Sequence, residues 1–69
     1  MVTDEMISKK ISEAIKQSGL KQVELSQKLE INQSVISDYL NGKKMPTLHT
    51  LANLCILLDL DANDILCVR

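Results

Sequence analysis

Apolar residues recur at helical spacing along almost the whole chain, and this pattern limits the fold to a bundle of short helices. In the first stretch, Ile7, Ile11 and Ile15 share one helical face. Two glycines and one proline are too few for the hairpins and tight turns of an all-β fold. The chain fits one domain over residues 1–69, with a thin aliphatic core, because Tyr39 is its only aromatic residue. We therefore expect a compact all-α domain.

Capping residues and helix breakers divide the chain into five helices. After a first helix, the expected spans are residues 22–29, 33–41 and 48–58, followed by a last short helix. The expected N-caps are Thr3, Asn32, Thr47 and Asp61. Gly19 and Gly42 suit the left-handed position that follows a helix, whereas Asp59, in the same place after the fourth helix, tolerates that backbone less well.

The third expected helix has one polar and one apolar face. Its continuous polar arc consists of Gln33, Ser34, Ser37, Asp38 and Asn41. The opposite arc consists of Val35, Ile36, Tyr39 and Leu40. Short hydrogen-bonding side chains suit base edges in the DNA major groove, where Gln pairs with adenine, Asp accepts from cytosine N4 and Ser serves several bases. A polar face alone is also what any surface helix shows.

The segments on either side of this helix carry groups suited to phosphate. Lys21 and Gln22 open the second helix, whose backbone N–H groups attract anions, and Lys43 and Lys44 follow the third. Phosphate contacts of this kind set the register, while base contacts set sequence preference. The net charge of −1 is unfavourable for a nucleic-acid binder.

The uneven distribution of charge along the chain makes the negative net charge less unfavourable for binding nucleic acid. Residues 19–47 hold four lysines against three acids, whereas residues 48–69 hold Arg69 against three aspartates. The slight positive excess therefore lies in the middle of the chain, where the polar helix is expected.

Other classes of protein are excluded by what the sequence lacks. The longest apolar run, residues 54–58, is too short to cross a membrane, and the N-terminus is acidic before its first apolar run, so we expect a cytoplasmic protein. Cys55, Cys67 and the single His49 show no metal-ligand spacing, which predicts two thiols and no metal or cofactor. With no glycine-rich phosphate loop either, we expect neither an enzyme nor a small-molecule substrate.

A string of residues at unbroken spacing carries a family resemblance. It comprises Gly19-Leu20, Gln22, Glu24 to Leu29, Ile31 to Ser37, Asn41 to Leu48, Leu51 to Cys55, Leu60-Asp61 and Ile65-Leu66. Over Ile11 to Leu66, about four-fifths of the chain, the sequence resembles the lambda-, Cro- and Xre-like helix-turn-helix repressor family.

The resemblance implies a five-helix bundle and a transcriptional regulator, a repressor, that binds double-stranded DNA through its second and third helices. In such proteins the position of Gln22 contacts a phosphate and braces the first recognition residue. The positions that face bases correspond to Gln33, Ser34, Ser37 and Asp38, and those that touch the DNA backbone to Asn41, Lys43 and Lys44. Fold does not fix function, so an antitoxin-like or protein-binding regulator is the alternative.

The chain departs from the family pattern at several positions. Glu30 stands where a turn glycine is common, which suggests a strained or differently shaped turn, and Lys21 stands where Ser or Thr usually caps the second helix. Ile15 and Leu40 replace an Arg–Glu pair that is commonly buried. Because losing both partners of a buried ion pair is tolerated better than losing one, we expect Ile15 and Leu40 to touch in the core.

The fourth helix suggests a homodimer. We expect its core arc to consist of Leu48, Leu51, Leu54, Cys55 and Leu58. Ile56 falls outside this arc, and Leu60, Cys67 and Val68 add apolar area near the same end of the chain. Family members of this length often pair through their last two helices, with recognition helices about 34 Å apart, so these four residues are the expected interface.

Overall fold

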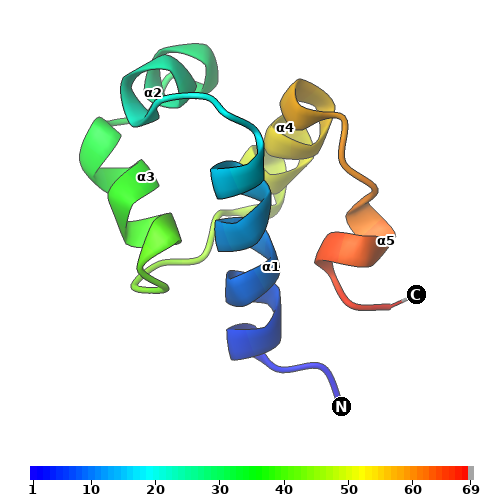
Figure 1. Ribbon diagram of the computed structural model, residues 1–69. Helices are drawn as coiled ribbons and strands as arrows, with labels where there is room; N and C mark the ends of the chain where they lie inside the picture. Colours follow the sequence, from blue (N-terminus) through cyan, green and yellow to red (C-terminus); the bar gives the residue numbers. More distant parts are fainter. Residues whose placement is uncertain (69) are drawn as a thin grey trace.

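The computed structural model describes residues 1–68, and these form five helices and no strand (Figure 1). The helices are α1 (Asp4–Gln17), α2 (Gln22–Leu29), α3 (Gln33–Leu40), α4 (Leu48–Leu58) and α5 (Ala62–Ile65). The predicted all-α bundle and its helix positions are thereby confirmed. Arg69, which was counted in the charge of the C-terminal third, lies outside the described residues. No helix within residues 1–68 has the length and apolar character needed to cross a membrane.

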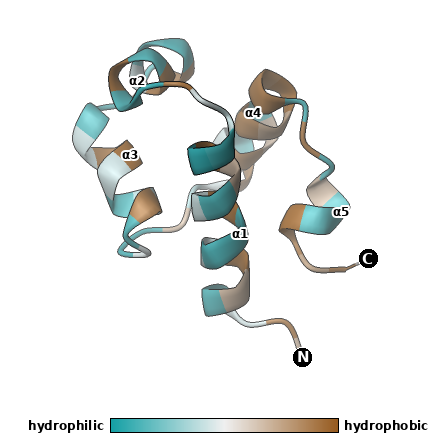
Figure 2. Ribbon diagram, in the orientation of Figure 1, coloured by the Kyte–Doolittle hydropathy of each residue, from teal (hydrophilic) through white to brown (hydrophobic). Residues whose placement is uncertain are grey.

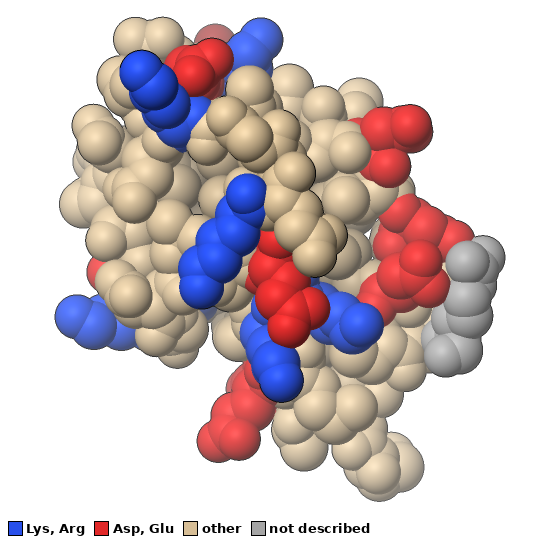
Figure 3. Space-filling model, viewed as in Figure 1, with Lys and Arg blue, Asp and Glu red and all other residues tan. Residues whose placement is uncertain are grey.

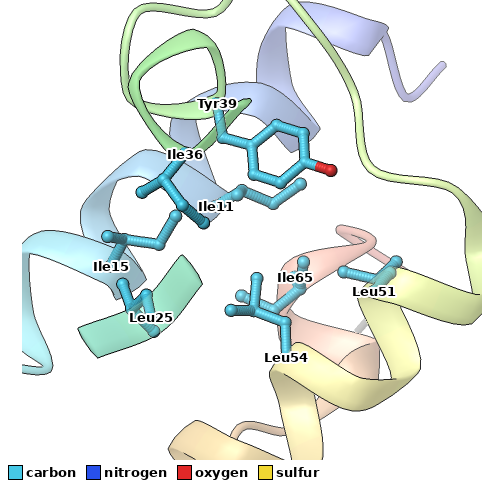
Figure 4. Close-up of a cluster of buried hydrophobic side chains, with 8 residues drawn as sticks. All are labelled: Ile11, Ile15, Leu25, Ile36, Tyr39, Leu51, Leu54 and Ile65. Atoms are coloured by element: carbon cyan, nitrogen blue, oxygen red, sulfur yellow. The ribbon is translucent and has the colours of Figure 1, made fainter. Parts of the chain in front are cut away.

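Helix α1 runs through the middle of the bundle, with α2 and α3 on one side and α4 and α5 on the other (Figure 1). Hydrophobic residues make up most of α4, and they alternate with hydrophilic residues along the other helices (Figure 2). The buried core takes one or two residues from every helix (Figure 4), namely Ile11, Ile15, Leu25, Ile36, Tyr39, Leu51, Leu54 and Ile65. The core therefore fixes α3 against α1, α2 and α4 through α3's apolar face.

Side chains cap three of the four helices where capping was expected. Thr3 Oγ1 accepts from the Met6 N–H at 3.3 Å, and Thr47 Oγ1 accepts from the Thr50 N–H at 3.2 Å. Asp61 likewise caps α5 through the Asn63 N–H. Asn32 occupies the N-cap position of α3, but its side chain makes no capping hydrogen bond.

A backbone hydrogen bond, and not the Asn32 side chain, satisfies a first-turn N–H group of α3. The Val35 N–H donates to the Asn32 main-chain carbonyl at 3.0 Å, so this first-turn donor has a partner without the amide. The expected capping position was correct, and the expected capping interaction was wrong.

Four of the five described helices end in the same way. A residue with positive φ follows each of them, and the next N–H donates to a carbonyl five residues back. The four left-handed residues are Glu30, Gly42, Asp59 and Cys67. Only one of them is glycine, so three of these turns carry the backbone strain of a side chain in the left-handed region.

Leu48 contradicts the predicted core arc of α4, because its side chain is 83% exposed. The other members of that arc are buried or half-buried. Leu48 is the first residue of α4 and lies on the helical face of Ala52 and Ile56, four and eight residues later, both of which are exposed. The exposed side of α4 is therefore more apolar than expected.

Candidate nucleic-acid interface

The polar face of α3 lies on the outside of the molecule. It consists of Gln33, Ser34, Ser37, Asp38 and the C-capping Asn41, all of them exposed or half-buried. On the opposite face, Ile36 is completely buried and Tyr39 is 5% exposed. All four predicted base-contacting side chains thus lie along one outward surface, which is the arrangement that a helix needs to enter a major groove.

Hydrogen bonds from α1 hold the C-terminal end of α3 and the loop that follows. Ser12 Oγ donates to the Leu40 carbonyl at 3.0 Å, and Ser8 Oγ contacts Met45 Sδ at 2.9 Å. Burial of the Tyr39 ring on the same side of α3 raises the pKa of its phenol. The loop that carries Lys43 is therefore anchored at both ends, by α3 and by α1.

The turn between α2 and α3 keeps a left-handed residue even though it has no glycine. Glu30 has φ 57° and ψ 42°, and the Ile31 N–H donates to the Ser26 carbonyl at 3.0 Å. Leu29 and Ile31 pack against the core on either side of Glu30. The suggestion of a strained turn holds, because Glu30 takes the conformation that glycine adopts without strain.

The start of α2 faces the start of α3 across a shallow hollow. Gln22 and Lys21 line this hollow together with Gln33. Lys21 has no acceptor atom with which to cap the helix, and its own N–H donates to the Glu24 carboxylate at 3.3 Å. The first N–H groups of α2, at Gln22 and Val23, precede the helical hydrogen bonds and suit a phosphate.

Two side-chain pairs connect predicted base contacts to predicted backbone contacts. Lys44 Nζ lies 3.9 Å from Asp38 Oδ2, and the Asp38 side chain is only 30% exposed. Asn41 Nδ2 donates weakly to Ser37 Oγ at 3.4 Å. The Lys44 ammonium partly neutralises a carboxylate that would otherwise repel DNA phosphates, and it leaves Asp38 at the outward surface.

A further lysine, which the sequence analysis did not single out, borders this surface. Lys16 of α1 lines the hollow shared by Lys21, Gln22 and Gln33, and also a second hollow that includes Lys43 and Lys44. Lys16 therefore stands between the two groups of predicted phosphate contacts. The sequence signal was its place in the last turn of the first helix, but only the packing of α1 against α3 reveals its neighbours.

Charges are distributed unevenly around the bundle. In Figure 3, basic side chains lie over α1, α2 and the loop after α3, with acids among them, while the charged side chains of the described residues over the α5 end are acidic. The acids of that end are Asp59, Asp61 and Asp64. The more positive part of the surface is the part that carries the polar face of α3.

The four predicted dimer residues are placed differently from one another. Ile56 and Val68 are 79% and 66% exposed. Leu60 is half-buried against the core, and Cys67 is half-buried in a hollow lined by Met6 and other residues of α1. Only two of the four therefore offer most of their side chain to a partner.

Comparison with known proteins identifies the family. Residues 11–65 match the family described as Helix-turn-helix. The chain is also 36% identical over 53 residues to the "ImmF control region 10 kDa protein" of Bacillus phage phi105, an alignment that covers 77% of this chain and 59% of that relative. The chain thus spans less than two-thirds of the relative's length. No solved structure matches it significantly. Because the family match covers most of the sequence and includes all of α2, α3 and α4, the chain belongs to the helix-turn-helix family of DNA-binding regulators, of the Cro- and Xre-like type.

Proposed function

We propose that the chain regulates transcription, as a repressor, by binding double-stranded DNA with α3 in the major groove. The observation that carries this proposal is the outward face of α3, where Gln33, Ser34, Ser37 and Asp38 lie together on a helix whose other side is locked into the core. The relative from phage phi105 is named for a control region, which accords with a regulatory role. The proposal gives the chain no catalytic step.

In this proposal the base contacts come from the middle of α3. Gln33 suits an adenine, whose N6 and N7 match a side-chain amide. Asp38 accepts a hydrogen bond and has no proton to donate, so it favours the N4 amino group of cytosine and disfavours guanine O6. Ser34 and Ser37 complete the reading surface with hydroxyls that either donate or accept.

Phosphate contacts flank the reading surface on both sides. On one side are Lys21 and Gln22 at the start of α2, and on the other are Asn41, Lys43 and Lys44. Lys16 adds a contact that bridges the two groups. Because the net charge is −1, these few lysines carry most of the electrostatic attraction, and each makes a measurable share of the salt dependence.

The test begins by selecting bound duplexes from a random library. For the selected site, we expect Gln33→Ala to lower affinity by roughly 1–3 kcal/mol and to relax the preference at one base pair. Gln17→Ala is the matched control, because Gln17 is exposed on α1 and lines a hollow on the α5 side. Equal binding of every duplex by the parent and by the Gln33 variant would contradict the groove assignment.

Lysine variants test the phosphate contacts separately. We expect Lys43→Ala and Lys16→Ala each to weaken binding to all duplexes alike and to make the salt slope shallower by about one unit. Lys10→Ala is the control, because Lys10 is exposed and lines hollows on the α5 side. A Lys16 variant that keeps the parent's slope would remove Lys16 from the interface.

A protein partner is the second candidate function, because three aspartates at the α5 end give the chain an acidic surface away from α3. An antitoxin-like regulator would use such a surface to hold its target. Binding to duplex DNA that weakens as salt increases separates the two functions.

We also propose that the chain acts as a homodimer, since paired recognition helices would read two half-sites one helical turn apart.

A further inference from the structure

The loop after α3 brings a lysine back to the polar face of that helix. Lys44 Nζ lies 3.9 Å from Asp38 Oδ2, and the two side chains are 60% and 30% exposed. An ammonium has three N–H donors and a carboxylate has two acceptor oxygens, so this contact leaves both groups able to bind a further partner. The pair therefore presents a donor and an acceptor side by side.

The backbone at the end of α3 positions this pair. Gly42 has φ 71°, and the Lys43 N–H donates to the Asp38 carbonyl at 2.8 Å. This turn ties the start of the loop to Asp38 itself, so the chain at Lys44 lies beside the last turn of α3. Lys44 also shares a hollow with acids of α1, yet the ion pair that it forms is with Asp38.

The pairing makes Lys44 a weaker phosphate ligand than its neighbour Lys43. A carboxylate beside an ammonium lowers the positive potential that attracts phosphate. Lys43 forms no ion pair within residues 1–68. An exposed ion pair also adds little to the stability of a fold. Neither attraction to phosphate nor stability of the fold therefore explains why Lys44 lies beside Asp38.

A C·G base pair offers the matching groups in the major groove. Its edge carries the N4 amino donor of cytosine next to the O6 and N7 acceptors of guanine. The Asp38 carboxylate can accept from N4 while the Lys44 ammonium donates to O6 and N7. An adenine also offers an amino group, but acceptors flank it on both sides, so the second carboxylate oxygen would face one of them. The side-chain pair is therefore more complementary to C·G than to A·T.

We propose that Asp38 and Lys44 act together to read one C·G base pair, with Asp38 on cytosine N4 and Lys44 on guanine O6 and N7. This inference rests on the proposed function, and it assigns Lys44 to a base in place of the phosphate assigned above. Because Lys44 neutralises the carboxylate near the DNA phosphates, each partner supports the contact that the other makes. Removing Lys44 therefore weakens binding mainly to the duplex that carries C·G.

Binding measurements on four related duplexes test the pair. Site selection with the parent and with Asp38→Ala identifies the base pair concerned, and fluorescence anisotropy then compares duplexes that differ only there. We expect the parent to prefer C·G by at least about tenfold, and Lys44→Ala to lower that preference about fivefold or more. Lys43→Ala is the matched control, because Lys43 lies in the same loop without an ion pair, and it should weaken all four duplexes alike.

A guanine analogue with carbon in place of N7 tests the lysine contact directly. In the C·G duplex it should weaken binding by the parent and by Lys43→Ala, and it should leave binding by Lys44→Ala unchanged. The pair is overturned, and the groove assignment stands, if Lys44→Ala weakens all four duplexes equally, if the analogue affects the parent and Lys44→Ala alike, or if the parent prefers another base pair at this position. A parent that binds every duplex alike overturns both. Circular dichroism checks that each variant keeps its helices.

Discussion

The left-handed residue between α2 and α3 makes Glu30→Gly a stabilising substitution. Glu30 has φ 57° in a turn whose glycine would adopt this conformation freely, and its side chain is exposed. It also places a negative charge at the carboxyl end of α2, where the helix dipole favours a positive one. Removing the side chain therefore relieves two unfavourable terms without opening a cavity.

The magnitude follows from three terms. Relief of left-handed strain contributes roughly 1–2 kcal/mol, and removal of the charge contributes about 0.3 kcal/mol. The greater freedom of glycine in the unfolded chain opposes this by roughly 0.5–1 kcal/mol. We expect a net gain of about 1 kcal/mol in the free energy of unfolding, which raises the Tm of a domain of this size by about 4–8 °C.

Two companion variants separate these terms in thermal and urea unfolding. Glu30→Ala removes the charge but keeps a Cβ in the left-handed region, so it should recover only the small dipole term. Gly42→Ala introduces the same strain at φ 71°, where an added Cβ meets nothing within 4 Å, and should lower stability by about 1 kcal/mol or less. If Glu30→Gly is no more stable than Glu30→Ala, the strain assigned to this turn is wrong.

Two further substitutions test the core. Ile15 is 3% exposed, so Ile15→Arg should lower the free energy of unfolding by roughly 3–5 kcal/mol. Adding Leu40→Glu restores the ion pair that is common in the family and should recover part of that loss. Equal stability of the single and double variants in urea would contradict contact between these two positions. Burial raises the pKa of Tyr39 above its ordinary value. The neutral phenol therefore makes its full contribution to the free energy of unfolding below about pH 10, and this contribution is lost as pH rises through the folded-state pKa. Tyr39→Phe should therefore lose less stability than the parent between about pH 9 and pH 11, and ultraviolet absorbance of this only tyrosine reports the ionisation directly.

Helix positions were predictable because the signals were local. Thr3, Thr47 and Asp61 cap helices from the positions expected of them, and Gly42 takes the left-handed conformation that its place after α3 implied. Each of these signals depends on a residue and its neighbours within one turn. The polar face of α3 was equally predictable, because a helical wheel needs only the period of the helix.

The differences between expectation and structure have separate physical causes. Leu48 falls near the core arc of an isolated α4, but as the first residue of that helix it projects past the bundle into solvent. Asn32 is an excellent capping residue, yet the backbone already satisfies the donor it would bind. Lys16 is one of several lysines of α1, and only the packing of α3 and its following loop beside α1 places it near Lys21 and Lys43. The Asn32 outcome is decided within the first turn of α3, whereas the exposure of Leu48 and the neighbours of Lys16 depend on how the helices pack.

A chain with a net charge of −1 can approach a polyanion because three of its acids, at the α5 end, lie away from α3. Lys16, Lys43 and Lys44 border the surface of α3, while the acids of the α5 end lie on the far side of α1. In the field of DNA, the orientation with α3 toward the duplex brings these lysines closer to the phosphates than the aspartates of the α5 end. In the proposed complex only a few lysines would reach phosphates, which would limit affinity for arbitrary sequence. In the proposed complex, discrimination between sequences would rest on the hydrogen-bonding side chains of α3, which is the property a regulator of selected sites requires.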